Sequence, residues 1–127
     1  MKVLLVDDHA LFAKSLSIAL CDFPEIEQFS STKDIQHLEE LIAGELPDIL
    51  LIDINLGGLT DEDGLMLTKH LLEHFPEQKI VILSGYNLPV YRKEAKRVGA
   101  KGFISKDVEP DELLHILLMV NDGATHF

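Results

Sequence analysis

The chain has 127 residues, of which 46% are hydrophobic and 26% charged, as expected for one globular domain with a single hydrophobic core. Its net charge of -11 disfavours a DNA-binding surface, because nucleic-acid affinity comes largely from lysine and arginine at phosphates. The only cysteine, Cys21, excludes an intramolecular disulfide and is typical of a reducing compartment. No apolar run approaches the ~18 residues of a membrane span, and the opening run is too short for a secretory signal. We therefore expect a cytoplasmic protein without contact with a membrane.

The first quarter of the chain predicts a buried strand, a helix and a weaker strand. The apolar run Lys2 to Val6 indicates the first strand, and Ile26 to Ser30 the weaker one. Between them, about Ala10 to Cys21, apolar residues recur at helical spacing. The expected apolar face of this helix consists of Leu11, Phe12, Leu16, Ala19 and Leu20.

The next helix is predicted over about Lys33 to Ala43. Ser31 and Asp34 have the spacing of a capping box, which satisfies the free amides at a helix start. Gly44 follows at the place where a glycine commonly ends a helix.

Two further apolar runs flank a third helix. The runs Asp48 to Ile52 and Lys79 to Leu83 predict strands that are buried on both faces. The helix between them is expected over about Leu65 to His74.

The last third of the chain predicts a helix, a strand and a final helix. The fourth helix covers about Leu88 to Val98, with Asn87 as its N-cap and Gly99 as its stop. The run Gly102 to Ser105 predicts the fifth strand. The fifth helix, about Pro110 to Asn121, opens with a proline followed by two acidic residues, which suit a helix start.

Five strands alternating with five helices predict an α/β fold, with a parallel sheet covered on both faces and right-handed crossovers. Residues 1–121 would form this one domain. The helical pattern is lost in residues 122–127, so we interpret them as the start of a connector or as a frayed end.

Polar residues stand at the ends of the four strongest apolar runs. They are Asp7 and Asp8, Asp53, Ser84 and Lys106, after the first, third, fourth and fifth strands respectively. The carboxyl ends of parallel strands meet at one edge of the sheet, where ligands bind in open α/β folds. We therefore expect three carboxylates, a hydroxyl and an ammonium to converge.

Three crowded carboxylates repel one another unless a hard cation lies between them, and Mg²⁺ prefers such oxygen ligands. Asp53 ends a central strand and is the best candidate for a nucleophile toward phosphorus, whereas the adjacent Asp7 and Asp8 suit the metal. Lys106 would offer a point charge to a phosphate oxygen, and Ser84 a hydroxyl donor.

Each of these residues also has a simpler interpretation. Asp7 and Asp8 could cap the next helix, and Asp53 could belong to a polar loop. Ser84 before a glycine is an ordinary turn residue, and Lys106 taken alone would be solvated. The prediction depends on the conjunction, since every run ends with the chemical type that the site needs.

Four segments resemble the receiver domains of two-component response regulators, the CheY-like family. They are VLLVDDH, ILLIDINLGG, VILSG and GAKGFISKD, and the resemblance covers the whole chain. It implies a flavodoxin-like (βα)5 fold in three layers, with strand order 2-1-3-4-5. It also implies Mg²⁺ bound by Asp8, Asp53 and the backbone carbonyl of Asn55, with Asp7 assisting, and phosphorylation at Asp53 by a histidine kinase or phosphotransfer protein.

The resemblance further implies a conformational switch. Ser84 would turn toward the phosphoryl group while Phe103, three positions before Lys106, moves inward. A half-buried strand position would also explain Phe103.

The opening DDHALF and the closing VNDGATHF resemble the NarL/LuxR-type subclass, whose receivers precede a helix-turn-helix DNA-binding domain. That domain is absent from these residues, so the chain is either a truncated regulator or a stand-alone receiver. We favour truncation, with residues 122–127 as the start of the linker, DNA bound only through the absent domain, and a homodimer as the possible active form.

Two departures from the family pattern follow Asp53. Gly57 stands where the family usually has proline, and the stretch Leu59 to Asp63 is longer than usual and acidic. The added charge could attract a cation or slow an anionic phosphodonor. A solvated loop, or an extra helical turn capped by Thr60, is the simpler explanation of this stretch, and we favour it.

The leading hypothesis is a signalling domain that catalyses its own phosphorylation and dephosphorylation and is otherwise not an enzyme. One alternative is a receiver-like interaction module that does not use phosphate. Another is a phosphatase with an aspartyl-phosphate intermediate, but such enzymes place two aspartates one residue apart, whereas Asp7 and Asp8 are adjacent. The glycine motifs of nucleotide-binding folds do not occur in the sequence.

Overall fold

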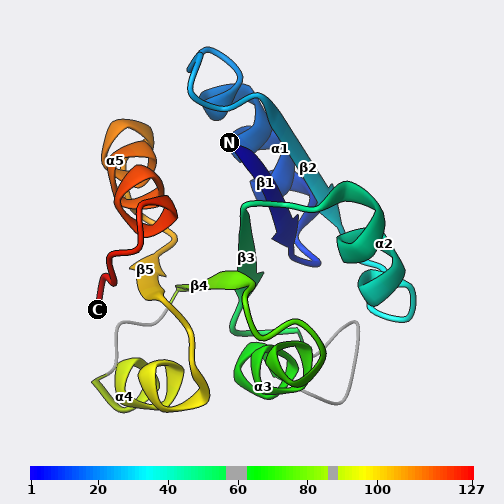
Figure 1. The fold of residues 1–127 in the computed structure, drawn as a ribbon. Helices are drawn as coiled ribbons and strands as arrows, with labels where there is room; N and C mark the ends of the chain where they lie inside the picture. The colour runs from blue at the N-terminus through cyan, green and yellow to red at the C-terminus, as the bar shows by residue number, and fades with distance from the viewer. Residues whose placement is uncertain (57–62, 86–88) are drawn as a thin grey trace.

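A parallel sheet of five strands in the order β2-β1-β3-β4-β5 forms the centre of the computed structural model, which describes residues 1–56, 63–85 and 89–127 (Figure 1). The strands are β1 (Lys2–Val6), β2 (Gln28–Thr32), β3 (Ile49–Asp53), β4 (Lys79–Ser84) and β5 (Gly102–Ser105). The helices are α1 (Ala10–Leu20), α2 (Leu38–Glu45), α3 (Gly64–His74), α4 (Pro89–Val98) and α5 (Pro110–Asn121). The predicted fold class and strand order are confirmed.

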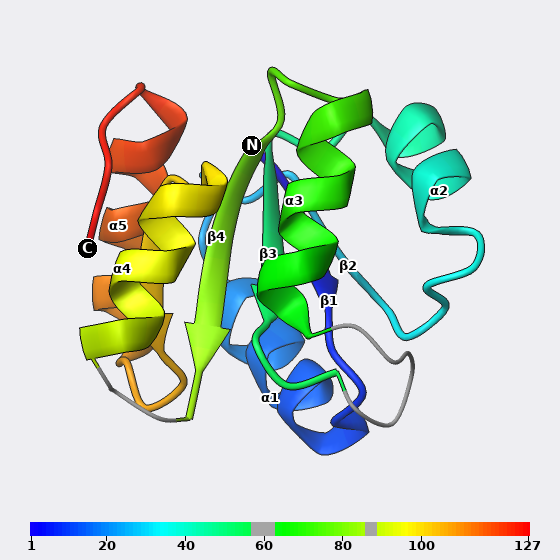
Figure 2. The same cartoon turned by 90° about the horizontal axis from the view of Figure 1, so that it is seen from below.

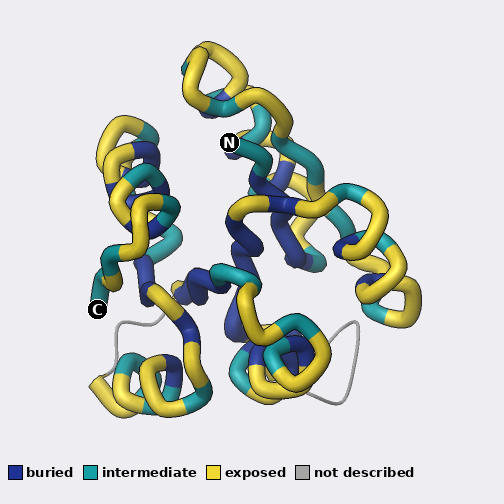
Figure 3. The backbone as a smooth tube through the Cα atoms, viewed as in Figure 1, coloured by how far each residue is buried: buried dark blue, intermediate teal, exposed yellow. Residues whose placement is uncertain are grey.

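Helices cover both faces of the sheet, which makes three layers (Figures 1 and 2). One hydrophobic cluster joins α1 and α5 to the sheet, and a second joins α2, α3 and α4 to its other face. Neighbouring residues of a strand point to opposite faces, so Leu4 and Leu5 enter different clusters, yet both are fully buried. This two-sided burial explains why the segments of β1, β3, β4 and β5 are largely apolar, and Figure 3 shows these strands as mostly buried. The edge strand β2 is polar and only partly buried.

The start of α2 was predicted wrongly. The helix begins at Leu38, because polar side chains in the preceding turn form hydrogen bonds with nearby backbone amides. Thr32 Oγ1 accepts a hydrogen bond from the Asp34 amide at 3.0 Å, and Asp34 Oδ1 accepts one from the His37 amide at 3.2 Å. Side chains that bind nearby backbone in this way compete with helix formation, so Ser31 and Asp34 form no capping box.

The end of α2 also differs from the prediction. Gly44 lies inside the helix, and the left-handed residue that follows the helix is Leu46, with φ of 51°. The predicted stop at Gly99 is confirmed in its conformation, since its φ is 102° after the last residue of α4.

Part of the predicted apolar face of α1 is not core. Leu16 and Leu20 are buried, but Leu11 is 80% exposed and Ala19 is only partly buried. The remaining boundary differences are small: β2 lies two residues later than expected, and the other strands and helices differ by one residue or none.

Several features predicted after β3 and β4 lie outside the described residues, namely Gly57, Thr60, Asp61, Glu62 and Asn87. Asp63 is described and has a clear local role. Its Oδ1 accepts a hydrogen bond from the Met66 amide at 2.8 Å, so Asp63 is the N-cap of α3.

Residues after α5 lie beside β5 rather than fraying. The Phe103 amide donates to the His126 carbonyl at 2.8 Å, and the His126 amide donates to the Lys101 carbonyl at 2.9 Å. Figure 1 shows the C-terminus next to β5, and Phe127 packs against the second hydrophobic cluster. Within the part of the chain that is described, no helix is long and apolar enough to cross a membrane.

Gly64 sits where the start of α3 approaches the backbone at the end of β3 closely. A Cβ atom at this position would overlap the carbonyl oxygen of Asp53 and lie 2.8 Å from the Cα of Ile54. The helix start of α3 therefore packs directly on the end of β3, where no side chain fits.

We expect Gly64→Ala to lower the free energy of unfolding by about 1–3 kcal/mol, because the backbone around Asp53 must move. Gly44→Ala is the matched control: it lies within α2 with no atom within 4 Å of the added Cβ, and should stabilise by about 0.5–1 kcal/mol. Urea unfolding of both variants measures the difference. Equal effects at the two positions would contradict the close approach.

Candidate functional site

The residues predicted to converge all lie at the carboxyl edge of the sheet. Asp7 and Asp8 follow β1, Asp53 and Ser84 are the last residues of β3 and β4, and Lys106 follows β5. Parallel pairing brings these ends side by side, and the Lys106 amide donates to the Ser84 carbonyl at 2.9 Å. Asp7, Asp53 and Ser84 are buried, although each is polar.

Lys106 links the two buried aspartates. Its Nζ lies 3.0 Å from Asp7 Oδ2 and 3.0 Å from Asp53 Oδ2. The same ammonium lies 4.6 Å from the centre of the Phe12 ring, which adds a cation–π contact. One cation therefore balances part of the charge of two buried carboxylates.

His9 belongs to the site, and sequence reasoning missed it. Its Nδ1 lies 2.8 Å from Asp7 Oδ1, 3.2 Å from Asp8 Oδ1 and 3.3 Å from Asp53 Oδ2. The sequence did offer one signal, since His9 directly follows the aspartate pair. A residue just before a helix, however, more often caps that helix than joins a site. His9 is the N-cap of α1 and makes no capping bond with its side chain.

Burial and neighbouring charges move the pKa values of the two buried aspartates in opposite directions. Burial raises the pKa of Asp53, and the contact with Lys106 only partly offsets this. Burial alone would also raise the pKa of Asp7, but hydrogen bonds from the His9 amide and Lys106 outweigh it and hold this pKa below its usual range. The pKa of His9 is raised, mainly by its hydrogen bond with Asp7.

The carboxylates of this cluster fit a hard divalent cation. Asp7, Asp8, His9 and Asp53 each direct one ligand atom into a space where these atoms lie within 4.8 Å of one another. Asp8 Oδ1 is buried, and no described residue forms a hydrogen bond with it. Clustered carboxylate oxygens with unused lone pairs are the ligands that Mg²⁺ prefers.

Two other predicted site residues occupy defined positions. The Asn55 amide donates to Asp53 Oδ1 at 3.1 Å, which holds the carboxylate in place, and Asn55 itself is exposed. Phe103 is 3% exposed and packs in the core below Arg92, whose guanidinium carbon lies 5.7 Å from the ring centre. The half-buried position considered for Phe103 is therefore wrong.

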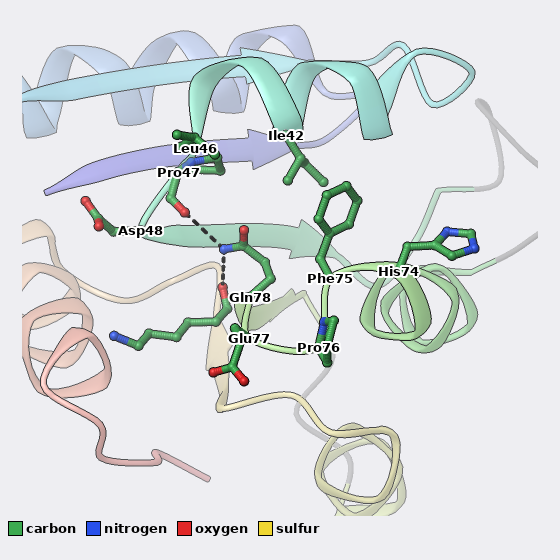
Figure 4. A pocket seen from close by; sticks show the side chains of 10 residues that line it. Ile42, Leu46, Pro47, Asp48, His74, Phe75, Pro76, Glu77 and Gln78 are labelled. Carbon is green, nitrogen blue, oxygen red and sulfur yellow. Dashed lines mark hydrogen bonds between the residues drawn. The ribbon is translucent and has the colours of Figure 1, made fainter.

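An open hollow of about 480 Å³ lies over the site, and it is lined by His9, Phe12, Asp53, Ile54, Asn55, Gly85 and Lys106. A second hollow of about 480 Å³ lies at the opposite edge of the sheet, where β3 and β4 begin (Figure 4). There Phe75 points toward Ile42, and Gln78 Nε2 donates to the carbonyls of Pro47 and Lys79 at 3.2 Å each. Two backbone carbonyls of this second hollow are therefore already partnered, and none of the predicted site residues line it.

A family model, the response regulator receiver domain, matches residues 3–118. Curated relatives include the transcriptional regulatory protein DegU of Brevibacillus brevis, 27% identical over 99% of this chain and 52% of its own length. The oxygen regulatory protein NreC of Staphylococcus haemolyticus is 32% identical over 99% of this chain and 57% of its own. The chain thus spans about half the length of these relatives.

Solved structures share the fold over nearly the whole chain. The signal receiver domain of a NarL response regulator from Mycobacterium tuberculosis is 25% identical with a TM-score of 0.80, and 96% of each chain is covered. A LuxR-family two-component response regulator from Aurantimonas sp. SI85-9A1 has a TM-score of 0.87 at 21% identity, covering 99% of this chain and 88% of its own. The second likeness shows the fold alone.

The opposite pKa shifts lead to a stability prediction for the metal-free protein. Because the folded-state pKa of Asp53 is raised, ionised Asp53 lowers stability at neutral pH. We expect Asp53→Asn to raise the free energy of unfolding at pH 7 by an amount on the order of 1 kcal/mol. The gain should shrink as the pH falls toward about 4, where the carboxyl of the unfolded chain takes up its proton.

Urea unfolding in the presence of a chelator, at several pH values, measures this gain. Asp34→Asn is the control, because Asp34 is exposed and hydrogen bonds from His37 lower its pKa, so no gain is expected there. A loss of stability in Asp53→Asn would mean that the contact with Lys106 outweighs the cost of burial.

Proposed function

Because the chain belongs to the response regulator receiver domain family, we propose that it is a phosphorylation switch whose phosphoacceptor is Asp53, with Mg²⁺ as its cofactor. The observation that carries this proposal is the position of Lys106 Nζ, 3.0 Å from both Asp7 Oδ2 and Asp53 Oδ2, at the edge of the sheet. Asp53 and Lys106 line one open hollow, and Asp7 and Asp8 belong to the same cluster of candidate ligands as Asp53.

In the proposed reaction, a carboxylate oxygen of Asp53 attacks phosphorus of a phosphohistidine donor. The new O–P bond forms as the P–N bond breaks, and the donor imidazole leaves with the bonding electron pair and takes a proton. The product is an acyl phosphate on Asp53. The Asn55 amide donates to Asp53 Oδ1 and Lys106 Nζ donates to Oδ2, so Oδ2 would become the reacting oxygen once Lys106 moves away from it.

The other residues of the site have supporting roles in this proposal. Asp7, Asp8 and the backbone carbonyl of Asn55, together with Asp53, would hold Mg²⁺, which supplies charge neutralisation for the transferred phosphoryl group. Lys106 would move from its bridging position to a phosphoryl oxygen, because charge-assisted hydrogen bonds are the stronger kind. Ser84, buried at the end of β4, would donate its hydroxyl to another phosphoryl oxygen.

The output of the switch would reach Phe103. A phosphoryl group adds roughly -1.5 to -2 charge and forms new hydrogen bonds in only one conformation. Phe103 is already buried in this structure, so the proposed rearrangement concerns how it packs with Ser84 and Arg92 rather than its entry into the core. A complete swing from 1:99 to 99:1 needs about 5.5 kcal/mol, so a partial shift reinforced by dimerisation is the better expectation.

The partners follow from the family and from the relatives. A histidine kinase or phosphotransfer protein would supply the phosphoryl group, and the exposed Leu11 beside the site offers it an apolar contact. The output would be transcriptional control through a helix-turn-helix domain in the full-length regulator, and the protein would act in the cytoplasm. The relatives DegU and NreC bear the names of regulatory proteins, and this chain matches about half of each.

The test is the intact mass of the protein after incubation with acetyl phosphate, with Mg²⁺ or with a chelator. We expect one phosphoryl addition that requires Mg²⁺ and is lost in Asp53→Asn, while Asp34→Asn is labelled like the wild type. No addition in folded protein that also fails to bind Mg²⁺ would favour an interaction module that does not use phosphate.

Lys106→Ala tests the cation that bridges the carboxylates. We expect slower labelling by about tenfold or more, because removing one positioned hydrogen-bond donor costs roughly 10²–10³-fold in acyl transfer and Mg²⁺ would compensate part of the loss here. The rate of mass gain under saturating acetyl phosphate measures the effect. Lys101→Ala, at an exposed lysine before β5, is the control, and an equal loss in both variants would contradict the role of Lys106.

A further inference from the structure

The His9 side chain turns into the acidic site instead of capping α1. Nδ1 is 2.8 Å from Asp7 Oδ1, 3.2 Å from Asp8 Oδ1 and 3.3 Å from Asp53 Oδ2. The His9 amide also donates to Asp7 Oδ1 at 2.8 Å, which fixes the residue beside that carboxylate. One ring nitrogen thus faces the same three carboxylates that would hold a cation.

These separations are those of neighbouring ligands around one ion. With metal–ligand bonds of about 2.1 Å, adjacent ligands of an octahedral site lie roughly 3 Å apart. The distances of 2.8, 3.2 and 3.3 Å from Nδ1 to the carboxylate oxygens match that spacing. Lys106 Nζ lies 3.3 Å from the same nitrogen, so a cation already competes for this space.

The side chain is exposed enough to leave the site by breaking its hydrogen bond with Asp7. It is 55% exposed, unlike the buried Asp7 and Asp53, and α1 receives no capping bond from it. Turning the imidazole outward therefore costs the helix nothing and leaves the oxygen ligands in place.

The identity of the cation decides which position is favoured. Mg²⁺ prefers oxygen ligands and keeps several waters, so it has little use for an imidazole. Imidazole suits Co²⁺, Ni²⁺ and Zn²⁺ much better, and these ions also bind N/O sites more tightly in general. If His9 is a fourth ligand for Co²⁺, Ni²⁺ and Zn²⁺ but not for Mg²⁺, the site binds these three ions more tightly, relative to Mg²⁺, than the carboxylates alone would.

We propose that His9 is a specificity-determining ligand of the site: its Nδ1 joins the carboxylates when Co²⁺, Ni²⁺ or Zn²⁺ binds, and it swings out when Mg²⁺ binds. This inference rests on the proposed function, because it assumes the cation site that phosphorylation needs. It goes further by giving the site a second class of cation.

The test compares Co²⁺ and Mg²⁺ affinity in wild type and His9→Asn by calorimetry at one fixed pH, starting from metal-free protein. Asparagine is a good N-cap, so the variant keeps α1 while it loses the imidazole. We expect the preference for Co²⁺ over Mg²⁺ to fall about tenfold, through weaker Co²⁺ binding, with Mg²⁺ affinity nearly unchanged. His9→Ala should give the same fall.

His37→Asn is the matched control. His37 is the N-cap of α2, makes no capping bond with its side chain, and has Nδ1 2.8 Å from Asp34 Oδ2, away from the site. The preference should be unchanged in this variant. A second readout is the proton NMR spectrum of the Co²⁺ form, where a shifted, exchangeable ring N–H signal of a bound histidine should be present in wild type and His37→Asn and absent in His9→Asn.

A change in preference of less than threefold in His9→Asn, or an equal loss of both metals, would overturn the proposal. If Mg²⁺ still binds and acetyl phosphate still labels Asp53, this result removes the role of His9 and leaves the proposed function standing. If wild-type protein binds neither metal, both fail together.

Discussion

The pairing of Lys106 with two buried aspartates is the interaction on which the rest of the site depends. Two carboxylates packed at the ends of β1 and β3 repel each other and lose hydration, and either cost alone would raise their pKa values. The ammonium at 3.0 Å from both offsets much of this, and the opposite shifts of Asp7 and Asp53 show that the compensation is unequal. The site retains a deficit of positive charge, which a divalent cation can supply.

Backbone contacts around the end of β3, rather than bonds between the site's side chains, help to keep Asp53 close to Asp7. The start of α3 lies directly on the end of β3, since Gly64 leaves no space for a side chain beside the Asp53 carbonyl. The Gly64 amide donates to the Ile54 carbonyl at 2.8 Å, and the Ile54 amide donates to the Leu83 carbonyl at 2.9 Å. These bonds fix the end of β3 against α3 and β4, and so restrain Asp53 from moving away from its neighbours.

The sequence predicted the features that depend on long-range pattern and failed where local chemistry decides. Continuous apolar runs identified the strands, and the polar residue after each run located Asp7, Asp53, Ser84 and Lys106, because parallel strands must end at one edge. The start of α2 was predicted wrongly because Thr32 and Asp34 accept hydrogen bonds from nearby backbone amides, which competes with helix formation. The hydrophobic pattern of the sequence does not show such local bonds. His9 was missed because its role comes from the direction of one side chain, which neither spacing nor hydrophobicity encodes.

The same strand that brings Lys106 to the site also connects the site to the end of the chain. β5 spans only Gly102–Ser105, and the Lys106 amide at its end is bonded to the Ser84 carbonyl. Its other side is occupied by the segment after α5, through the Phe103 amide and the His126 carbonyl. A displacement of Lys106 toward a phosphoryl group would therefore act on a strand only four residues long, with Phe103 at its second position and the His126 segment bonded to it. Under the proposed function, such a path would need no relay across the core, because β5 has Lys106 directly after its end and is itself bonded to the His126 segment through Phe103.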